Sequence, residues 1–170
     1  TGIGESKRMA DAAHKWLVET EWLAAHLDTP GLVILDGSMH LPTSGRNARK
    51  EYGSEHIPGA IFFDIDEVAD KKSTLPHMLP SPTKFASRMK KMGVGDGMHI
   101  VAYDSEGLYS AARAWWMFRT MGHDEVRVLN GGLKKWRAED RPLEDGHPRQ
   151  RTPRHFTPVY NAGLVRDATE

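Results

Sequence analysis

The stretch EYGSEHIPGAIFFDID at residues 51–66 combines a histidine, a proline and two aspartates around a short apolar run. Pro58 fixes its own backbone φ angle, and Gly59 adopts conformations that other residues avoid, so the pair favours a tight turn. The apolar residues 60–63 follow directly and are typical of a buried strand. The sequence therefore predicts a turn that leads into a strand, with His56 at its entrance.

Outward from this stretch, short apolar runs alternate with helical patterns. Strands are predicted at residues 32–35, 60–63, 99–103 and 126–129, helices at 21–27, 46–54, 82–92, 110–121 and 132–139, and a long loop at 67–80. Thr20 and Ser81 are predicted as helix N-caps, and Gly93 as a helix stop. Such alternation implies parallel strands joined by right-handed crossovers. We expect an α/β fold of three layers, with a small, mainly parallel sheet of about five strands and helices on both faces.

Composition excludes several classes of function. The 170 residues suit one domain with tails, and 23 basic residues balance 23 acidic ones, which leaves no electrostatic footprint for nucleic acid. No apolar run approaches the roughly 20 residues that span a bilayer, and the first residues lack the apolar core of a signal peptide. We expect a soluble, cytoplasmic protein with no nucleic acid and no membrane among its partners.

The chain contains no cysteine, which excludes disulfides, thiolate metal sites and thiol nucleophiles. Its nine histidines do not show H-E-x-x-H spacing, so no metal site and no cofactor are expected. The glycine-rich residues 93–97 follow a helix and precede a strand, the reverse of the order that a phosphate-binding loop needs.

Changes in composition divide the chain into four parts. Residues 1–14 are expected to form a flexible leader, and 15–143 the domain itself. Proline and charged residues dominate 144–160, which indicates a semi-extended linker between domains. A helix-like pattern resumes at 161–170 and is interpreted as the start of a truncated second domain.

Three blocks of the sequence carry a resemblance to a known family. They are SGRNARKEYGSEHIPGAIFFDID at residues 44–66, DSEGLYSAARAWWMFRTMGH at 104–123 and VRVLNGGLKKW at 126–136. Together they resemble the amino-terminal half of the tandem-domain sulfurtransferases of the rhodanese superfamily, of the thiosulfate and 3-mercaptopyruvate type. The similarity covers roughly residues 16–143, and it implies a rhodanese-like fold.

The resemblance also implies a division of labour. In this family the catalytic cysteine sits on a loop of the second domain, and the first domain is a copy without that cysteine. The intact protein would move sulfane sulfur from thiosulfate or 3-mercaptopyruvate to a thiol or cyanide acceptor through a cysteine persulfide. The implied partners are the second, cysteine-bearing rhodanese domain of the same protein and a small anionic sulfur donor.

The loop Asp104, Ser105, Glu106, Gly107 is interpreted as the degenerate equivalent of the active loop, so this chain alone is expected to be inactive. Ligands of α/β sheets bind at the carboxyl ends of strands, where backbone N–H groups and a helix N-terminus would stabilise a thiolate. Two carboxylates stand there instead, able to take up those donors and to repel anions. Ser105 and Ser110 lack the adjacent base that a serine nucleophile needs, and we interpret them as a turn residue and a helix cap.

Two interpretations of His56 stay open. The imidazole could hydrogen-bond a nearby group and fix the turn, or it could support the cleft of the second domain with a polar partner upstream, Asn47. Close relatives often carry aspartate at that upstream position, so asparagine weakens a triad-like role. Arg46 and Arg49 could present a guanidinium to an anionic substrate, or lie on a solvated surface.

Asp64 and Asp66 close the strand of the opening stretch. A metal or acid–base role is conceivable for this pair, and capping of the following segment is the simpler interpretation. Two hypotheses for the whole chain remain. It is either the amino-terminal, non-catalytic half of a tandem sulfurtransferase, or a stand-alone cysteine-less rhodanese module for protein binding or regulation.

Overall fold

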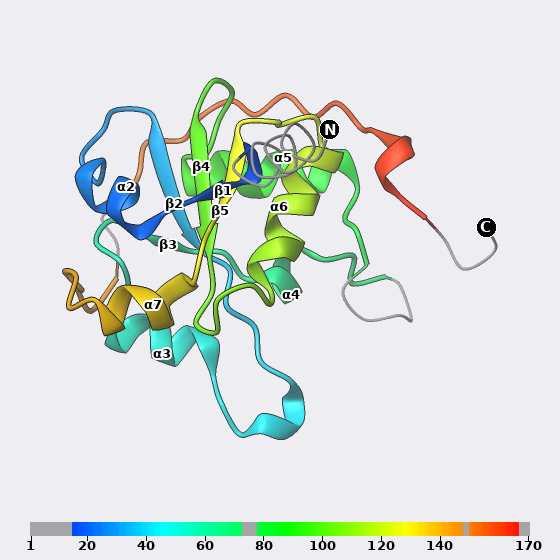
Figure 1. Cartoon of the computed structure of the whole chain (residues 1–170). Coiled ribbons are helices and arrows are strands. Elements are labelled where there is room, and N and C mark those ends of the chain that lie inside the picture. Colours follow the sequence, from blue (N-terminus) through cyan, green and yellow to red (C-terminus); the bar gives the residue numbers. More distant parts are fainter. Residues whose placement is uncertain (1–14, 73–77, 148–149, 167–170) are drawn as a thin grey trace, which may run out of the picture.

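A five-stranded parallel sheet forms the centre of the computed structural model, which describes residues 15–72, 78–147 and 150–166 (Figure 1). The strands are β1 (Leu17–Val18), β2 (Leu32–Asp36), β3 (Ile61–Phe62), β4 (His99–Tyr103) and β5 (Val126–Leu129), in the spatial order β1-β5-β4-β2-β3. All four pairings are parallel. The predicted α/β fold is therefore confirmed.

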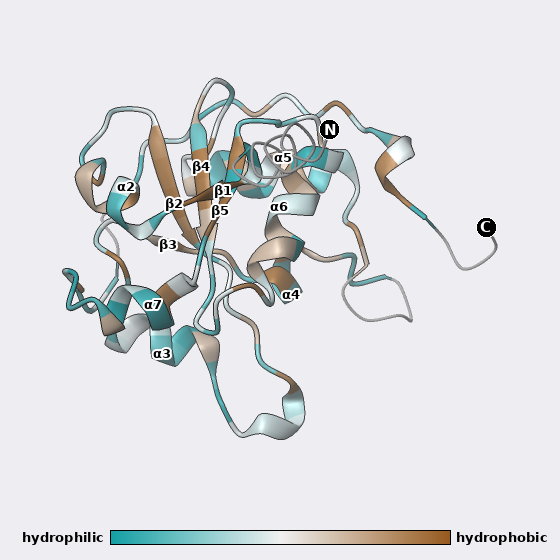
Figure 2. Cartoon of the chain, in the orientation of Figure 1, coloured by the Kyte–Doolittle hydropathy of each residue, from teal (hydrophilic) through white to brown (hydrophobic). Residues whose placement is uncertain are grey.

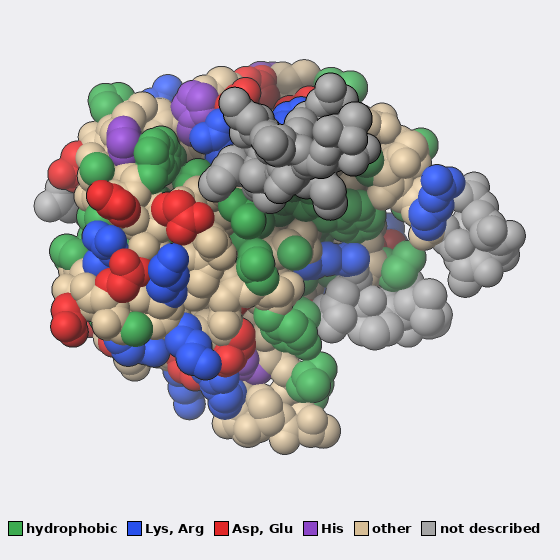
Figure 3. All heavy atoms as spheres, in the orientation of Figure 1, with side chains coloured by type: hydrophobic (Ala, Val, Ile, Leu, Met, Phe, Trp, Pro, Cys, Tyr) green, Lys and Arg blue, Asp and Glu red, His purple; other side chains and the backbone are tan. Residues whose placement is uncertain are grey.

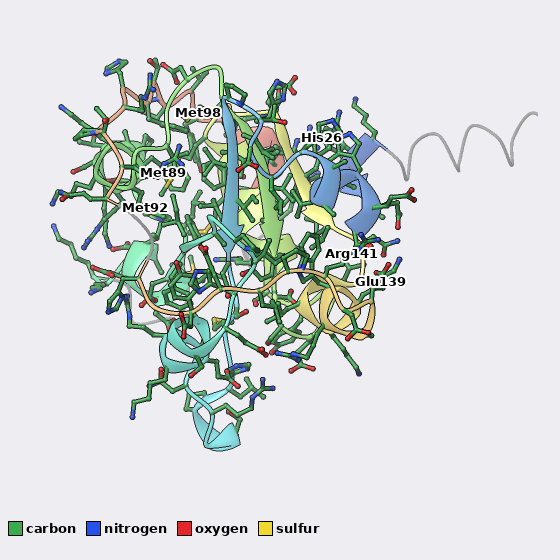
Figure 4. All side chains as sticks on the ribbon, turned by 90° about the vertical axis from the view of Figure 1, so that its left-hand side faces the viewer. His26, Met89, Met92, Met98, Glu139 and Arg141 are labelled. Carbon is green, nitrogen blue, oxygen red and sulfur yellow. The ribbon has the colours of Figure 1, made fainter. Side chains whose placement is uncertain are left out.

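Helices cover both faces of the sheet. One face carries α2 (Thr20–Ala25), α3 (Ala48–Ser54) and α7 (Gly132–Ala138), and the other carries α4 (Ile65–Val68), α5 (Pro82–Met92) and α6 (Ala111–Thr120). Figure 4 shows the two sides, with Met89, Met92 and Met98 on one side of the sheet and His26 on the other. Hydrophobic residues concentrate in the strands, as Figure 2 shows, because β2 and β4 are buried on both faces.

Local signals placed most elements correctly. Ser81 caps α5 by accepting a hydrogen bond from the Lys84 N–H at 3.2 Å, and Gly93 ends that helix with a φ of 72°. The sequence missed β1, which has only two residues, and it missed α4, which overlaps the start of the region expected as a loop. Residues 73–77 of that region lie outside the described residues.

The prediction that Thr20 is the N-cap of the first helix is wrong. The N-cap position of α2 belongs to Glu19, and Thr20 lies within the first turn. Its hydroxyl donates a hydrogen bond to Glu139 Oε1 at 2.7 Å, and Arg141 pairs with the other oxygen of Glu139 at 3.1 Å (Figure 4). The Thr20 side chain, which was expected to cap a helix, thus joins α2 to the end of α7.

The segment expected as a linker is extended but packs against the domain. We call residues 151–161 the strap. Phe156 in its middle is 4% exposed and enters the core, with its ring centroid 5.3 Å from that of Phe85 and 5.8 Å from that of His123. Backbone bonds hold both ends of this contact, from the Asp96 N–H to His155 and from the Val159 N–H to Met121.

Glycines allow the strap to approach this closely. A Cβ atom at Gly93, Gly95 or Gly122 would lie 2.6 to 2.7 Å from strap atoms of Arg151, Arg154 and Val159 respectively. The strap continues to the short 3-10 helix η2 (Ala162–Leu164), whose last carbonyl accepts a hydrogen bond from Trp116 Nε1. The predicted leader at 1–14 and residues 167–170 of the predicted second-domain start lie outside the described residues.

Candidate functional site

Two loops meet at the carboxyl edge of the sheet. One follows β2 and runs to α3, passing through the 3-10 helix η1 (Pro42–Ser44), and the other follows β4 at residues 104–110. The Ser38 hydroxyl accepts a hydrogen bond from the Ser105 N–H at 3.0 Å, and the Ser110 hydroxyl accepts one from the Met39 N–H at 3.0 Å. These two bonds hold the loops together beside the N-terminus of α6.

The side chain of Asp104 fills a nest of backbone donors. Its Oδ1 accepts hydrogen bonds from the N–H groups of Glu106 at 2.9 Å and Gly107 at 2.7 Å. Its Oδ2 accepts from Tyr109 and Ala111, both at 2.8 Å. Asp104 is 1% exposed. The geometry is that of an anion-binding loop whose anion is part of the chain, so these four donors are unavailable to an external anion.

Ser110 does not cap α6 with its side chain, contrary to the sequence interpretation. It occupies the N-cap position, but its hydroxyl is engaged with Met39, and the Ala111 N–H at the start of the helix donates to Asp104 instead. Ser110 is buried, and neither it nor Ser105 has a histidine among its hydrogen-bond partners in the described chain.

Glu106 turns outward, away from the nest. Its carboxylate pairs with the Arg46 guanidinium at 2.5 Å, which in turn pairs with Glu51 at 2.8 Å, and Glu51 contacts His40. The hydrogen bond from Arg46 lowers the pKa of Glu106 below its usual range. Partial burial raises the pKa of Glu51, but hydrogen bonds from Arg46 and His40 outweigh it and lower the pKa. Arg46 therefore clamps one loop to the other.

Arg49 is likewise paired within the chain, with Asp64 at 3.0 Å and Glu67 at 3.5 Å. Asp64 also caps α4 by accepting from the Glu67 N–H, which is the capping role expected from the sequence. The arginines, Asp64 and Asp66 border a cavity of about 300 Å³ beside the β2 loop. In the described part of the chain, no group of three or more side chains is arranged to hold a metal ion.

Asn47 and His56 do not form the expected pair. The Asn47 Oδ1 atom accepts a hydrogen bond from the Lys50 N–H at 3.0 Å and caps α3. His56 is 0% exposed, and its ring stacks on Tyr52 with centroids 4.1 Å apart. The His56 Nδ1–H donates to the Tyr52 carbonyl at 2.7 Å.

The second ring nitrogen of His56 finds a partner that the sequence did not indicate. Nε2 lies 3.2 Å from Glu144 Oε1, and the same oxygen accepts the Gly59 N–H at 2.7 Å. Backbone bonds in both directions join His56 to Glu144 as an isolated β-bridge. His56 thus locks the turn to the segment that follows α7, which favours the structural interpretation over direct contact with a substrate.

A buried acid lies below this edge. Asp36 ends β2, and its Oδ1 accepts the Ser38 N–H at 2.9 Å. Burial raises the pKa of Asp36. Burial also raises the pKa of the Tyr103 phenol well above its usual value, with the charge of Asp36 adding to the shift. Sequence reasoning passed over Asp36, although its place between an apolar strand and a glycine was a usable signal.

The fold is that of a rhodanese-like domain, and the chain contains no cysteine. The Rhodanese-like domain family matches residues 19–139, and the chain belongs to that family.

Three curated relatives show the extent of the similarity. It is 48% identical over 132 residues to 3-mercaptopyruvate sulfurtransferase of Escherichia coli K12, covering 77% of this chain and 47% of that protein. The human 3-mercaptopyruvate sulfurtransferase is 46% identical over 156 residues, covering 88% and 52%. Bovine thiosulfate sulfurtransferase is 42% identical over 159 residues, covering 90% and 53%. The chain thus spans about half the length of these relatives.

Solved structures agree. SseA from Escherichia coli is a 3-mercaptopyruvate sulfotransferase with the rhodanese fold. Its crystal structure superposes on this chain with a TM-score of 0.85 and 43% identity. The match covers 91% of this chain and 59% of SseA. No helix in the described residues is both long and apolar enough to cross a membrane.

Proposed function

We propose that this chain is the amino-terminal, non-catalytic rhodanese domain of a sulfurtransferase that moves sulfane sulfur from 3-mercaptopyruvate or thiosulfate to a thiol or cyanide acceptor. The sulfur would be carried as a persulfide on a cysteine of a second domain. In this proposal the chain supplies one wall of the substrate cleft and the surface on which the second domain packs. The relatives' activities and the chain's share of their length support the assignment.

The observation that carries the proposal is the occupied nest. Sulfur relay through this fold needs an anionic sulfur held by backbone donors at the strand end. Here Asp104 already accepts four such hydrogen bonds. A carboxylate has no sulfur to carry, and its charge repels thiosulfate. The site keeps the geometry of an anion-stabilising loop and has lost the group that reacts.

The carboxyl edge also offers a surface for a partner. Leu41 is 59% exposed, and Leu108 and Tyr109 are 57% and 51% exposed; all three lie in the two loops at this edge. Large apolar side chains exposed together favour a protein contact over free solvent. Burial of these three residues by the second domain is part of the proposal.

A chimaera tests this assignment. The chain is joined to the second half of the Escherichia coli 3-mercaptopyruvate sulfurtransferase, and sulfur transfer from 3-mercaptopyruvate and from thiosulfate is measured. We expect no turnover by the chain alone, turnover by the chimaera, and none by a chimaera whose second-domain cysteine is replaced with serine. Turnover by the chain alone, or an inert chimaera that is folded, would contradict the proposal.

The second candidate is a stand-alone binding module without cysteine. A carboxylate at Asp104, in place of a sulfur nucleophile, is compatible with this candidate as well. The exposed residues Leu41, Leu108 and Tyr109 would then bind another protein. The two candidates differ in one measurable property. A half-enzyme binds an isolated, cysteine-bearing second domain in sedimentation experiments, and a stand-alone module does not.

A further inference from the structure

A second pocket lies at the opposite end of the sheet from the candidate site. It has a volume of about 230 Å³, and its lining includes Val18, Trp22, Leu32, Val101 and Arg127 together with the polar residues His99 and Glu125. This volume lies just below the range of pockets that take drug-sized ligands, so it suits a ligand with a single ring or a branched aliphatic body.

Strand register explains why the pocket is there. Leu32 pairs with His99 and Val101 with Arg127 in the parallel ladder, so these four side chains lie on one face. Val101 belongs to the core that α2, α3 and α7 cover. α2 is six residues long, and the pocket opens beside it at the amino-terminal ends of the strands. The floor of the pocket is apolar sheet surface formed by Leu32 and Val101.

Trp22 forms a wall. It is 38% exposed, and one side of its ring stacks on His26 with centroids 4.2 Å apart. This stacking fixes the orientation of the indole, so Trp22 presents a rigid apolar surface beside Leu32.

Arg127 carries a positive charge onto this face. Within the described residues its guanidinium forms no ion pair, and it projects from β5 beside Leu32, Val101 and His99. The carboxylate of Glu125, which also lines the pocket, has a partner of its own, because its Oε2 lies 3.1 Å from His99 Nδ1. An unpaired guanidinium next to an apolar floor is complementary to a carboxylate that carries an apolar body.

We propose that this pocket binds a small amphipathic monocarboxylate, with its carboxylate on Arg127 and its apolar body between Trp22 and the floor formed by Leu32 and Val101. The site is independent of the proposed sulfur chemistry, since it lies at the amino-terminal ends of the strands. Sulfur-transfer activity therefore plays no part in testing it.

The probes are 3-phenylpropionate and its uncharged amide, titrated into the complete chain and followed by the NMR shifts of Trp22 and Val101. We expect saturable binding of the acid and binding of the amide that is about tenfold weaker or more, since a charge-assisted pair is lost. Arg127→Gln should weaken acid binding by about the same factor and remove the preference over the amide. Trp22→Ala should weaken both probes.

Arg154→Gln is the matched control, because Arg154 is an exposed arginine outside the pocket. It should leave the acid affinity unchanged. Equal affinities for acid and amide, an Arg127→Gln variant that binds like the parent chain, an equal loss in Arg154→Gln, or shifts that map outside the pocket would each overturn the proposal. Exposed side chains are changed throughout, so folding is checked by the unchanged shifts of core residues.

Discussion

Replacement of Asp104 with asparagine should destabilise the domain far more than its position in a loop suggests. Each carboxylate oxygen accepts two backbone hydrogen bonds. Asparagine keeps one acceptor oxygen and places an NH2 group against the other two donors. Hydrogen bonds to a charged group contribute about 1.5 to 3 kcal/mol each, so loss of two costs roughly 3 to 6 kcal/mol.

Urea unfolding measures this cost. With a slope of about 1 to 3 kcal/mol per molar urea, the unfolding midpoint should fall by at least about 1 M. Glu106→Gln is the matched control in the same loop, because its pair with Arg46 is exposed and worth roughly 0 to 1 kcal/mol. If the two variants unfold at the same urea concentration, the nest does not hold the loop and the reasoning is refuted.

Three further predictions concern the nest around Asp104, the strap and the buried phenols. Asp104→Cys should give a thiol whose pKa lies below its ordinary value of about 8.5, because the same N–H groups would face the thiolate, and the pH dependence of alkylation measures it; an ordinary or raised value would contradict this. Phe156→Ala should lower the free energy of unfolding by about 3 to 5 kcal/mol, against little change for the exposed Val159→Ala, as measured by urea unfolding. Burial raises the pKa values of Tyr52 and Tyr103, so their contribution to stability is complete below about pH 10 and is lost as pH rises further. An absorbance titration should show both phenols ionising only when the chain unfolds. Ionisation of either phenol in the folded chain would contradict this prediction.

The sequence predicted those features that depend on neighbouring residues. The strand 99–103 and the cap at Ser81 were located correctly, since apolar runs and capping residues act over a few positions. The role of Asp104 could also be inferred, because a strand end followed by a helix start creates unpaired donors whatever the rest of the fold does.

The features that escaped prediction join distant parts of the chain. Glu144 lies 88 residues from His56, and nothing near either residue indicates the contact. Asn47 offered a plausible partner for the histidine but had a nearer task at the start of α3. β1 is too short for any periodicity and exists because it pairs with Val128 and Leu129. Phe156 was hidden among prolines and charges that are typical of a linker.

The strap changes where this module can be cut and exchanged. The family match ends at residue 139, yet an aromatic ring from residue 156 completes the interior, and three glycines on the body are shaped to receive the chain that carries it. Recombination with a junction directly after residue 139 would separate Phe156 from the core into which it packs. One chimaera would then have a cavity where Phe156 belongs, and the other would carry a Phe156 without its matching core. The unit to transfer therefore includes the strap, residues 151–161.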